Sequence, residues 1–300
     1  MGKPTILALD FNNVLYSHYY APKLTNSKGN PVQAIKGFMF RMKNLREMFN
    51  PDYIVIAHDV SRMKTFRRKL YPQYKANRKK TDPDFTFQAG QTLRLLSLLG
   101  FPLLSHEEYE ADDVLGMVSR LGDELKMNTI LVSADKDLYQ LVTDRTVVWS
   151  FRDNQLIDKQ YMLEHYRLTP NQWVDFKILK GDKSDNIIGI EGIGDKTALQ
   201  LIQGFHSIPE LYNNITKLSR SLQLKLLDGR DVLQLTRTLV TIVTDYKLLN
   251  LSEDSFKRKE VFMDEVYQTI HELEIPSLMN TIRYDLIPSK QEFYGPEEDY

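Results

Sequence analysis

ILALD (residues 6–10) is a short apolar run that ends in Asp10, and the same pattern returns twice along the chain. The run IVIAHD ends at Asp59, and ILVSADKD places Asp135 and Asp137 directly after its apolar residues. Continuous apolar runs of about four to eight residues are typical of strands that are buried on both faces. The sequence therefore predicts a set of buried strands, each followed by a carboxylate.

Longer amphipathic stretches separate the apolar runs. Residues 32–49, 87–99 and 111–126 carry apolar side chains at the three- and four-residue spacing of a helix with one buried face. The strands expected between them span residues 5–9, 53–57, 129–132 and 146–149. Alternating strands and helices imply right-handed crossovers, so we expect an α/β fold with a mainly parallel central sheet flanked by helices.

The organisation changes beyond about Pro170, where strand patterns fade and helical periodicity takes over. We expect an α/β core in residues 1–180, a helical portion in residues 181–250 and a C-terminal helical segment in residues 251–300. The final residues, from Lys290 onward, include three consecutive carboxylates and predict a loose acidic tail.

Composition limits the class of protein. The chain has 300 residues, of which 42% are hydrophobic, and this is ample for a large core. The absence of cysteine excludes disulfides, a thiol nucleophile and a cysteine-based zinc site. The start of the chain lacks the features of a secretory signal, and no apolar run approaches the roughly 20 residues of a membrane span. We expect a soluble, cytoplasmic monomer of a bacterial or phage-infected cell.

Nine carboxylates are expected near one rim of the sheet, because ligands of an open parallel sheet bind outside the carboxyl ends of its strands. Four of them follow strands, three open the helical stretch 111–126, and two lie in GDKSDN at residues 181–186. The nine are Asp10, Asp59, Glu110, Asp112, Asp113, Asp135, Asp137, Asp182 and Asp185.

These carboxylates have two interpretations. Any one of them could satisfy a helix dipole or form an ordinary turn. Nine together would repel one another strongly unless cations neutralise them. An all-oxygen set without His or Cys favours Mg²⁺ or Mn²⁺ over zinc. Two such ions about 4 Å apart can activate a water and stabilise the leaving oxygen of a phosphodiester, so metal binding is the favoured interpretation.

A basic segment stands out in a chain whose net charge is only −1. Between Asp59 and Asp82 there is no acidic residue, and three aromatic residues are interleaved with nine cations. The cations are Arg62, Lys64, Arg67, Arg68, Lys69, Lys75, Arg78, Lys79 and Lys80. A solvated surface loop is one explanation, but cations mixed with aromatic rings favour phosphate contact with base stacking.

GIEGIGDKTALQLI (residues 189–202) leads from a glycine-rich turn into an amphipathic stretch. A dinucleotide-binding fingerprint would need a third glycine where Thr197 stands, and a preceding strand. A helix–hairpin–helix fits better, because its turn and helix N-terminus present backbone N–H groups to phosphate. Lys183 and Lys196 beside the turn support this interpretation over a plain helix–helix connection.

Four pieces of the chain together resemble one family. They are TFRRKLYPQYKANR, YEADDVLG, SADKDLYQL and GDKSDNIIGIEGIGDKTA, in this order. The chain resembles the 5′ nucleases, which include flap endonucleases, the N-terminal 5′-exonuclease domain of bacterial DNA polymerase I and standalone bacteriophage enzymes. The likeness runs from Leu7 to about Tyr246, and the segment after about Leu251 matches no part of the family that we can place.

The resemblance implies roles for the carboxylates. Asp10, Asp59, Glu110 and Asp112 would hold one metal ion. Asp112 would be shared with a second ion, whose other ligands would be Asp135, Asp137 and Asp185. Asp113 and Asp182 match carboxylates that act mostly through water.

The resemblance also implies nucleic-acid contacts. The segment at about 62–86 would form a helical arch over the active site, in which Arg67, Lys75 and Arg78 engage the scissile phosphate. Residues 189–202 would form a helix–three-turn–helix that holds the duplex and, in family members, often a K⁺ ion. The other nucleic-acid contacts would be Lys64, Arg68, Tyr74, Lys79, Lys183, Gly192, Gly194, Lys196 and Thr197.

The implied function is a structure-specific 5′-3′ exonuclease and flap endonuclease of DNA replication or repair. It would use two Mg²⁺ ions, with Mn²⁺ as a substitute, on 5′ flaps, nicks and RNA–DNA hybrids, and it would remove RNA primers in an RNase H-like reaction. A single-strand-binding protein is an expected partner, and the absence of a polymerase region predicts a standalone enzyme.

Two alternatives belong to other classes. A haloacid-dehalogenase-type phosphatase needs a second aspartate two residues after the first, where Asn12 stands. A non-catalytic DNA-binding replication factor would gain nothing from carboxylates that face phosphates. Metal-dependent release of nucleotides from 5′-labelled DNA would separate all three.

Overall fold

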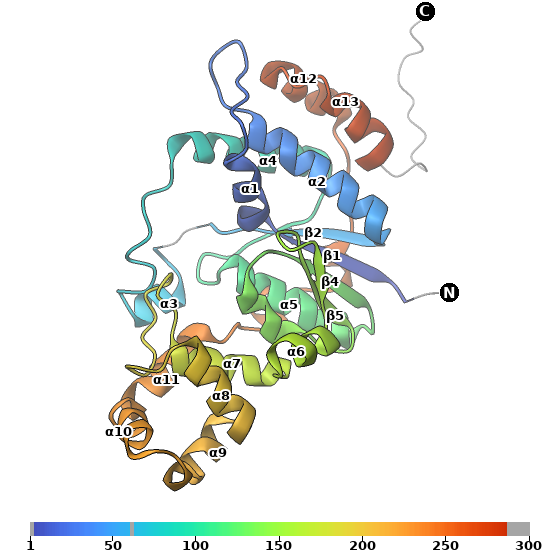
Figure 1. Cartoon of the computed structure of the whole chain (residues 1–300). Helices are drawn as coiled ribbons and strands as arrows, with labels where there is room; N and C mark the ends of the chain where they lie inside the picture. Colours follow the sequence, from blue (N-terminus) through green and yellow to red (C-terminus); the bar gives the residue numbers. More distant parts are fainter. Residues whose placement is uncertain (1–2, 61–62, 287–300) are drawn as a thin grey trace, which may run out of the picture.

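The structure is a computed structural model that describes residues 3–60 and 63–286 (Figure 1). Arg62 of the basic segment and the acidic tail expected from Lys290 onward lie outside the described residues. None of the helices in the described ranges is both long and apolar enough to cross a membrane.

A six-stranded sheet forms the centre of the larger portion, in the order β3-β2-β1-β4-β5-β6. The first five strands are parallel, and β6 pairs with β5 in the antiparallel direction. The strands are β1 (Thr5–Asp10), β2 (Tyr53–Ala57), β3 (Leu103–Leu104), β4 (Asn128–Val132), β5 (Thr146–Ser150) and β6 (Gln155–Ile157). The expected α/β class with a mainly parallel sheet is confirmed.

Helices cover both faces of this sheet (Figure 1). Those of the sheet portion are α1 (Phe11–Tyr19), α2 (Gln33–Phe49), α4 (Pro83–Leu98), α5 (Ala111–Glu124), the 3₁₀ helix η1 (Lys136–Leu141) and α6 (Lys159–Tyr166). Successive side chains of β1 alternate between the faces. Ile6 and Ala8 join the core beneath α5, whereas Leu7 and Leu9 join the core beneath α1, α2 and α4. A strand buried on both sides explains why ILALD is continuously apolar.

The helical portion lies at one end of the molecule (Figure 1). It consists of α7 (Pro170–Lys180), α8 (Asp195–Phe205), α9 (Ile208–Asn213), η2 (Ile215–Lys217), α10 (Arg220–Asp228), η3 (Arg230–Val232) and α11 (Leu233–Val240). Thr169 and Gln172 form a capping box at the start of α7. This helix packs against η1 as well as α8 and α11, so it joins the two portions.

The chain then returns to the sheet portion. The elements are η4 (Tyr246–Leu249), η5 (Glu253–Phe256), α12 (Met263–Leu273), α13 (Leu278–Asn280) and a π-helical turn, η6 (Thr281–Leu286). Val266, Ile270 and Leu278 are buried in the same core as α2 and α4. The helical C-terminal segment therefore completes the outer layer of the sheet portion.

The basic segment departs from the expected helical arch. Within the described residues between Asp59 and α4, helix is limited to α3 (Phe66–Leu70). Pro72 lacks an N–H, and a proline disfavours the helical conformation of the residue before it, Tyr71. Turns follow as far as Arg78, and α4 begins only at Pro83, after the N-cap Asp82.

Candidate active site

The site lies at the carboxyl ends of β1, β2 and β4, where the strand order reverses and open parallel sheets bind ligands. Asp10 ends β1 and accepts hydrogen bonds from the backbone N–H of Asn13 (3.1 Å) and the hydroxyl of Ser133 (2.9 Å). Asp59, two residues after β2, accepts from Asn12 Nδ2 (2.7 Å) and the N–H of Ala111 (2.9 Å). These bonds fix the starts of α1 and α5 to the rim.

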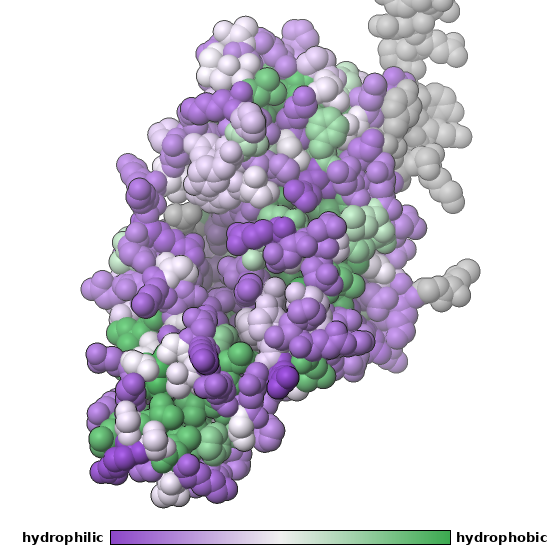
Figure 2. All heavy atoms as spheres, viewed as in Figure 1, coloured by the Kyte–Doolittle hydropathy of each residue, from purple (hydrophilic) through white to green (hydrophobic). Residues whose placement is uncertain are grey.

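Seven of the nine expected carboxylates line two adjoining cavities. The larger, about 140 Å³, is lined by Asp10, Asn12, Asn13, Tyr16, Asp59, Lys75, Arg78, Glu110, Ala111, Asp112 and Asp135. A smaller one of about 20 Å³ shares Glu110 and Asp112 with it and adds Asp137 and Asp185. Polar residues cover much of this face, which is hollowed beside the segment that joins α3 to α4 (Figure 2). The structure thus gathers the carboxylates into two groups with shared members.

The electrostatics of the rim are those of crowded, buried carboxylates. Burial, together with the nearby charges of Asp59 and Asp135, raises the pKa of Asp10 to about 7. Burial and the charges of Asp135 and Asp10 raise the pKa of Asp112 well above its usual range. Burial and Asp135 also raise the pKa of Asp137 to about 6. Such a set is stabilised by a divalent cation, and its oxygen donors fit Mg²⁺ or Mn²⁺.

Cationic side chains occupy part of this acidic site. Lys75 Nζ lies 2.6 Å from Glu110 Oε1 and 3.6 Å from Asp185 Oδ2, and Arg78 forms an ion pair with Asp185. Within residues 3–60 and 63–286, no group of three His, Asp or Glu side chains is arranged to hold a metal ion as it stands. The ion pairs hold the carboxylate oxygens of Glu110 and Asp185 toward ammonium and guanidinium groups.

Lys75 reaches this position through an uncommon backbone conformation. Its φ is 53°, in the left-handed region that long side chains seldom adopt. The N–H of Lys75 donates to the carbonyl of Asp185 at 2.8 Å, and Asn186 Nδ2 donates to the carbonyl of Gln73 at 2.8 Å. The basic segment therefore rests on the GDKSDN turn of the helical portion. Local strain of this kind concentrates at functional sites.

Arg67 and Asp113 do not have the positions expected of a phosphate-binding residue and a metal-site carboxylate. Arg67 is 3% exposed and Asp113 is fully buried, and they form a two-pronged ion pair. Arg67 also donates to the carbonyls of Leu239 and Thr241, both at 2.8 Å. Neither side chain can meet a phosphate or a metal ion without breaking this network. We therefore correct both assignments: Arg67 and Asp113 hold α3, α5 and the end of α11 together.

The expected contact of Tyr74 with nucleic acid also needs correction. Its ring is 4% exposed and its hydroxyl donates to Glu110 Oε2 at 2.7 Å, so it is not available for base stacking. The Arg68 guanidinium donates to the carbonyl of Tyr74 and supports the same turn. Lys64 is exposed but pairs with Glu107 at 3.0 Å, whereas Lys79 is exposed. Of the basic segment, Lys75 and Arg78 line the larger acidic cavity, and Lys79 follows Arg78 as an exposed cation.

Two kinds of site residue were missed by the sequence analysis. Tyr16 lines the larger cavity and stacks on Phe85, with ring centroids 3.8 Å apart. Lys177 on α7 is 5% exposed, and its Nζ lies 2.6 Å from both Asp137 and Asp182. A lysine between the apolar residues Phe176 and Ile178 was the available signal, because a charged group on a buried helix face needs a partner.

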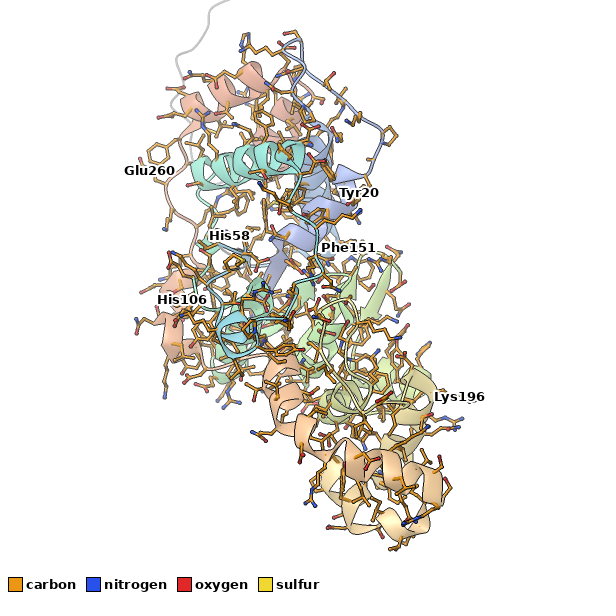
Figure 3. The ribbon with its side chains drawn as sticks, turned by 90° about the vertical axis from the view of Figure 1, so that its left-hand side faces the viewer. Tyr20, His58, His106, Phe151, Lys196 and Glu260 are labelled. Carbon is orange, nitrogen blue, oxygen red and sulfur yellow. The ribbon has the colours of Figure 1, made fainter. Side chains whose placement is uncertain are left out.

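The glycine turn lies beyond the acidic rim, in the helical portion. A pocket of about 830 Å³ is lined by residues 180–184 and 187–195. Gly192 has φ 73°, which favours glycine, and Gly194 is the N-cap of α8. Lys183 and Lys196 are exposed and Thr197 is half-buried. Lys196 lies on the helical portion, well away from His58 and His106 on the sheet portion (Figure 3).

The site combines an acidic rim, a cationic segment and a glycine turn at a helix N-terminus. This arrangement is typical of a metal-dependent enzyme that cleaves phosphodiesters. Comparisons with known sequences agree. The family described as "5'-3' exonuclease, N-terminal resolvase-like domain" matches residues 5–167, and "5'-3' exonuclease, C-terminal SAM fold" matches residues 168–264. The chain belongs to the 5′-3′ exonuclease family. The resemblance inferred from its four motifs is confirmed.

Individual relatives support this assignment. The 5′-3′ exonuclease of Aquifex aeolicus is 32% identical over 279 residues, which cover 93% of this chain and 95% of that protein. The thermostable DNA polymerase I of Thermus aquaticus is 36% identical over 280 residues, or 93% of this chain and 33% of that protein. This chain thus spans about a third of the length of the DNA polymerase I relatives.

The fold is similar to solved structures. That of the bacteriophage T5 5′-exonuclease with bound divalent metal ions (zinc) has a TM-score of 0.70 and 21% identity, over 90% of this chain and 99% of that chain. The catalytic core of Rad2 in complex with DNA substrate has a TM-score of 0.57 and 15% identity, over 90% of this chain and 87% of that chain. At these identities the likeness establishes the fold. Neither the phosphatase nor the non-catalytic alternative is supported.

Proposed function

We propose that this protein is a structure-specific 5′ nuclease that acts as a 5′-3′ exonuclease and flap endonuclease on DNA and on RNA primers. The observation that carries the proposal is that Lys75 and Arg78 line the same cavity as five carboxylates. A phosphodiester drawn to these cations would lie directly over the acidic rim.

Two Mg²⁺ ions, with Mn²⁺ as a substitute, would supply the charge that activates a water and stabilises the leaving oxygen. The carboxylates of one site would be Asp10, Asp59, Glu110 and Asp112. Those of the second would be Asp112, Asp135, Asp137 and Asp185. The raised pKa values of Asp10, Asp112 and Asp137 support these assignments, because they reflect burial together with nearby negative charges, which a metal ion would offset.

The chain's own cations would position the substrate. Lys75 and Arg78 would exchange their carboxylate partners for the oxygens of the scissile phosphate, which holds it in line with the attacking water. Tyr16, which lines the same cavity, would contact the adjacent nucleotide. Lys79 would contact the single strand, and its effect on binding would depend on salt.

The glycine turn would hold the duplex. The N–H groups at the start of α8, together with Lys183, Gly192, Gly194, Lys196 and Thr197, would contact backbone phosphates without reading the base sequence. A K⁺ ion at this turn is part of the proposal. The duplex would thereby be set at a fixed distance from the acidic rim, so that cleavage follows the 5′ end and not the sequence. The proposed substrates are 5′ flaps, nicks and RNA–DNA hybrids, with a single-strand-binding protein as a partner of the monomer.

The test is a product-length assay on matched flap, nicked, gapped and RNA-primed duplexes, with Mg²⁺ or with EDTA. We expect short 5′ products from the branched and nicked substrates in Mg²⁺ and none in EDTA. Asp135→Asn should lower the cleavage rate by orders of magnitude while duplex affinity holds or rises. Retained binding without any metal-dependent cleavage by the unaltered protein would favour a non-catalytic binding factor instead.

A further inference from the structure

Lys177 connects the two portions of the molecule at the acidic site. Its ammonium lies 2.6 Å from Asp137 Oδ1, at the rim of the sheet, and 2.6 Å from Asp182 Oδ2, in the turn after α7. The side chain is 5% exposed, so water screens these contacts little. Lys177 therefore bridges Asp137, which follows β4, and Asp182, which belongs to the helical portion.

Asp182 also forms hydrogen bonds within the turn that carries Asp185, so it links Lys177 to this turn. Its other oxygen, Oδ1, accepts from the N–H of Ser184 at 2.8 Å and from the hydroxyl of Ser184 at 2.6 Å. The N–H of Asp182 donates to the carbonyl of Ile187 at 2.9 Å, and the N–H of Ile187 donates back at 2.7 Å. Both oxygens of Asp182 are thus engaged in holding the turn, which leaves Asp185 as the residue of this turn that is directed at the site.

The same turn is closed by its two glycines. A Cβ on Gly181 would lie 2.4 Å from the N of Gly189, and one on Gly189 would lie 2.3 Å from the N of Gly181. The backbones at the two ends of the turn therefore approach each other closely, and the position of the turn relative to the sheet depends on what anchors it. Lys177 supplies this anchor from one side, and the basic segment does so from the other through Lys75 and Asp185.

We propose that Lys177 is a positioning residue for the second metal ion of the proposed function, on which this inference rests. By joining Asp137 to Asp182 it sets the spacing between Asp137 and Asp185, so that both are in place before a metal ion arrives. It also offsets the repulsion between Asp137 and Asp182, which would otherwise move the turn away from the rim.

Simple electrostatics makes the opposite prediction, and this makes the proposal testable. Lys177 carries a positive charge beside expected metal ligands, so its removal should strengthen metal binding if charge alone matters. If positioning matters more, its removal should weaken the binding of one ion. The sign of the change in affinity therefore separates the two effects.

The experiment counts Mn²⁺ ions bound to the full-length protein without DNA, from the electron paramagnetic resonance signal of free Mn²⁺. We expect two ions on the unaltered protein and a tenfold or larger loss of affinity for one of them in Lys177→Met. Lys177→Arg should recover part of this affinity, because a guanidinium can also bridge two carboxylates. Unchanged or tighter binding of two ions by Lys177→Met would overturn the proposal.

Lys180→Met is the matched control, because Lys180 lies on the same helix and pairs with Asp195 at 2.6 Å. It removes the same charge from an ion pair that involves neither Asp137 nor Asp182, and we expect two ions to bind with little change in affinity. Asp182→Asn keeps the Oδ1 acceptor but loses the charge that faces Lys177, and should weaken the same ion to a smaller extent. If the unaltered protein binds fewer than two ions, the two-metal assignment itself fails. The measurement on the unaltered protein therefore distinguishes that failure from a failure of the role of Lys177 alone.

Discussion

Arg67 and Asp113 face each other as a two-pronged ion pair, with Nη1–Oδ2 at 2.5 Å and Nη2–Oδ1 at 2.7 Å. Asp113 Oδ2 also accepts from the N–H of Glu110 at 3.0 Å, and Asp113 Oδ1 accepts from the N–H of Val243 at 2.9 Å. The pair therefore fixes the backbone of Glu110, an expected metal ligand, to the base of the basic segment. Its role is to hold the site together, with Arg67 in the lining of the smaller cavity.

The first prediction concerns this pair. Arg67→Met leaves the Asp113 carboxylate buried without its partner, which should lower the free energy of unfolding by about 3–5 kcal/mol. The double variant Arg67→Met/Asp113→Leu should recover part of the loss, because no charge stays buried alone. Urea unfolding measures both. Lys64→Met, which breaks an exposed pair, is the control and should cost less than about 1 kcal/mol. Intact stability of Arg67→Met with slow cleavage would restore the phosphate-binding role for Arg67.

The second prediction concerns pH. The folded pKa of Asp10 is about 7 and that of Asp137 about 6, both above the ordinary value of 3.8. The metal-free folded state therefore holds protons that the unfolded state releases, and its stability should fall as pH rises from about 4 through 7. A divalent cation must displace these protons. Its affinity should rise with pH, by up to about tenfold per unit for each proton displaced, and level off above about pH 8.

Calorimetric titration of Mg²⁺ at pH 6, 7 and 8, in two buffers of different ionisation enthalpy, measures both the affinity and the protons released. Asp10→Asn should reduce the number of protons released near pH 7. An affinity that is flat between pH 6 and 8, with no proton release, would show that these carboxyls are not metal ligands.

The third prediction separates positioning of the phosphate from general attraction. Lys75→Ala and Arg78→Ala should slow cleavage by roughly 10²–10³-fold, because an inexact placement of the phosphate loses the in-line geometry. Affinity for the duplex should change little. Lys79→Ala removes an exposed cation of the same segment, and should weaken binding and reduce the salt slope by about one unit. Single-turnover rates and binding at several salt concentrations give the comparison, and equal effects of all three variants would contradict it.

The sequence predicts the acidic rim well because a single rule relates sequence to position. A carboxylate that follows a strand of a parallel sheet must lie at its carboxyl edge, and Asp10, Asp59 and Asp135 do so. The same alternation predicted β1, β2, β4, β5 and the longer helices to within a few residues, but it did not predict the short strands β3 and β6. It missed α1, because FNNVLYSHY mixes polar and aromatic residues without a clear apolar stripe.

The pairing of charges could not be predicted from the sequence. Arg67 and Asp113 are 46 residues apart, and the sequence presents one as a basic-segment cation and the other as a rim carboxylate. Only the packing of α3 against α5 and α11 brings them together. Lys177 is close to Asp182 along the chain, but Asp137 reaches it from another portion of the fold. Tyr74 likewise gave an aromatic signal in the basic segment, although its ring is buried against Glu110.

The last prediction concerns the glycine turn, where the structure separates a role in folding from a role in binding. A Cβ on Gly181 or Gly189 would meet backbone atoms within 2.5 Å, so Gly181→Ala and Gly189→Ala should unfold or displace the turn that carries Asp185. Gly194 is different. A Cβ there meets nothing within 4 Å, and its φ of −96° is open to any residue.

Gly194→Val should therefore leave stability nearly unchanged, while its side chain keeps a phosphate from the N–H groups at the start of α8. We expect duplex affinity to fall about tenfold or more, to the same extent on duplexes of unrelated sequence, because only the backbone is contacted. Gly204→Val is the matched control: it also has open space around its Cβ, but lies near the far end of α8. Fluorescence anisotropy on two duplexes of different sequence, alongside thermal unfolding, measures the effect. A loss of affinity in Gly204→Val as large as in Gly194→Val, or one that depends strongly on sequence, would remove the glycine turn from the duplex-binding surface.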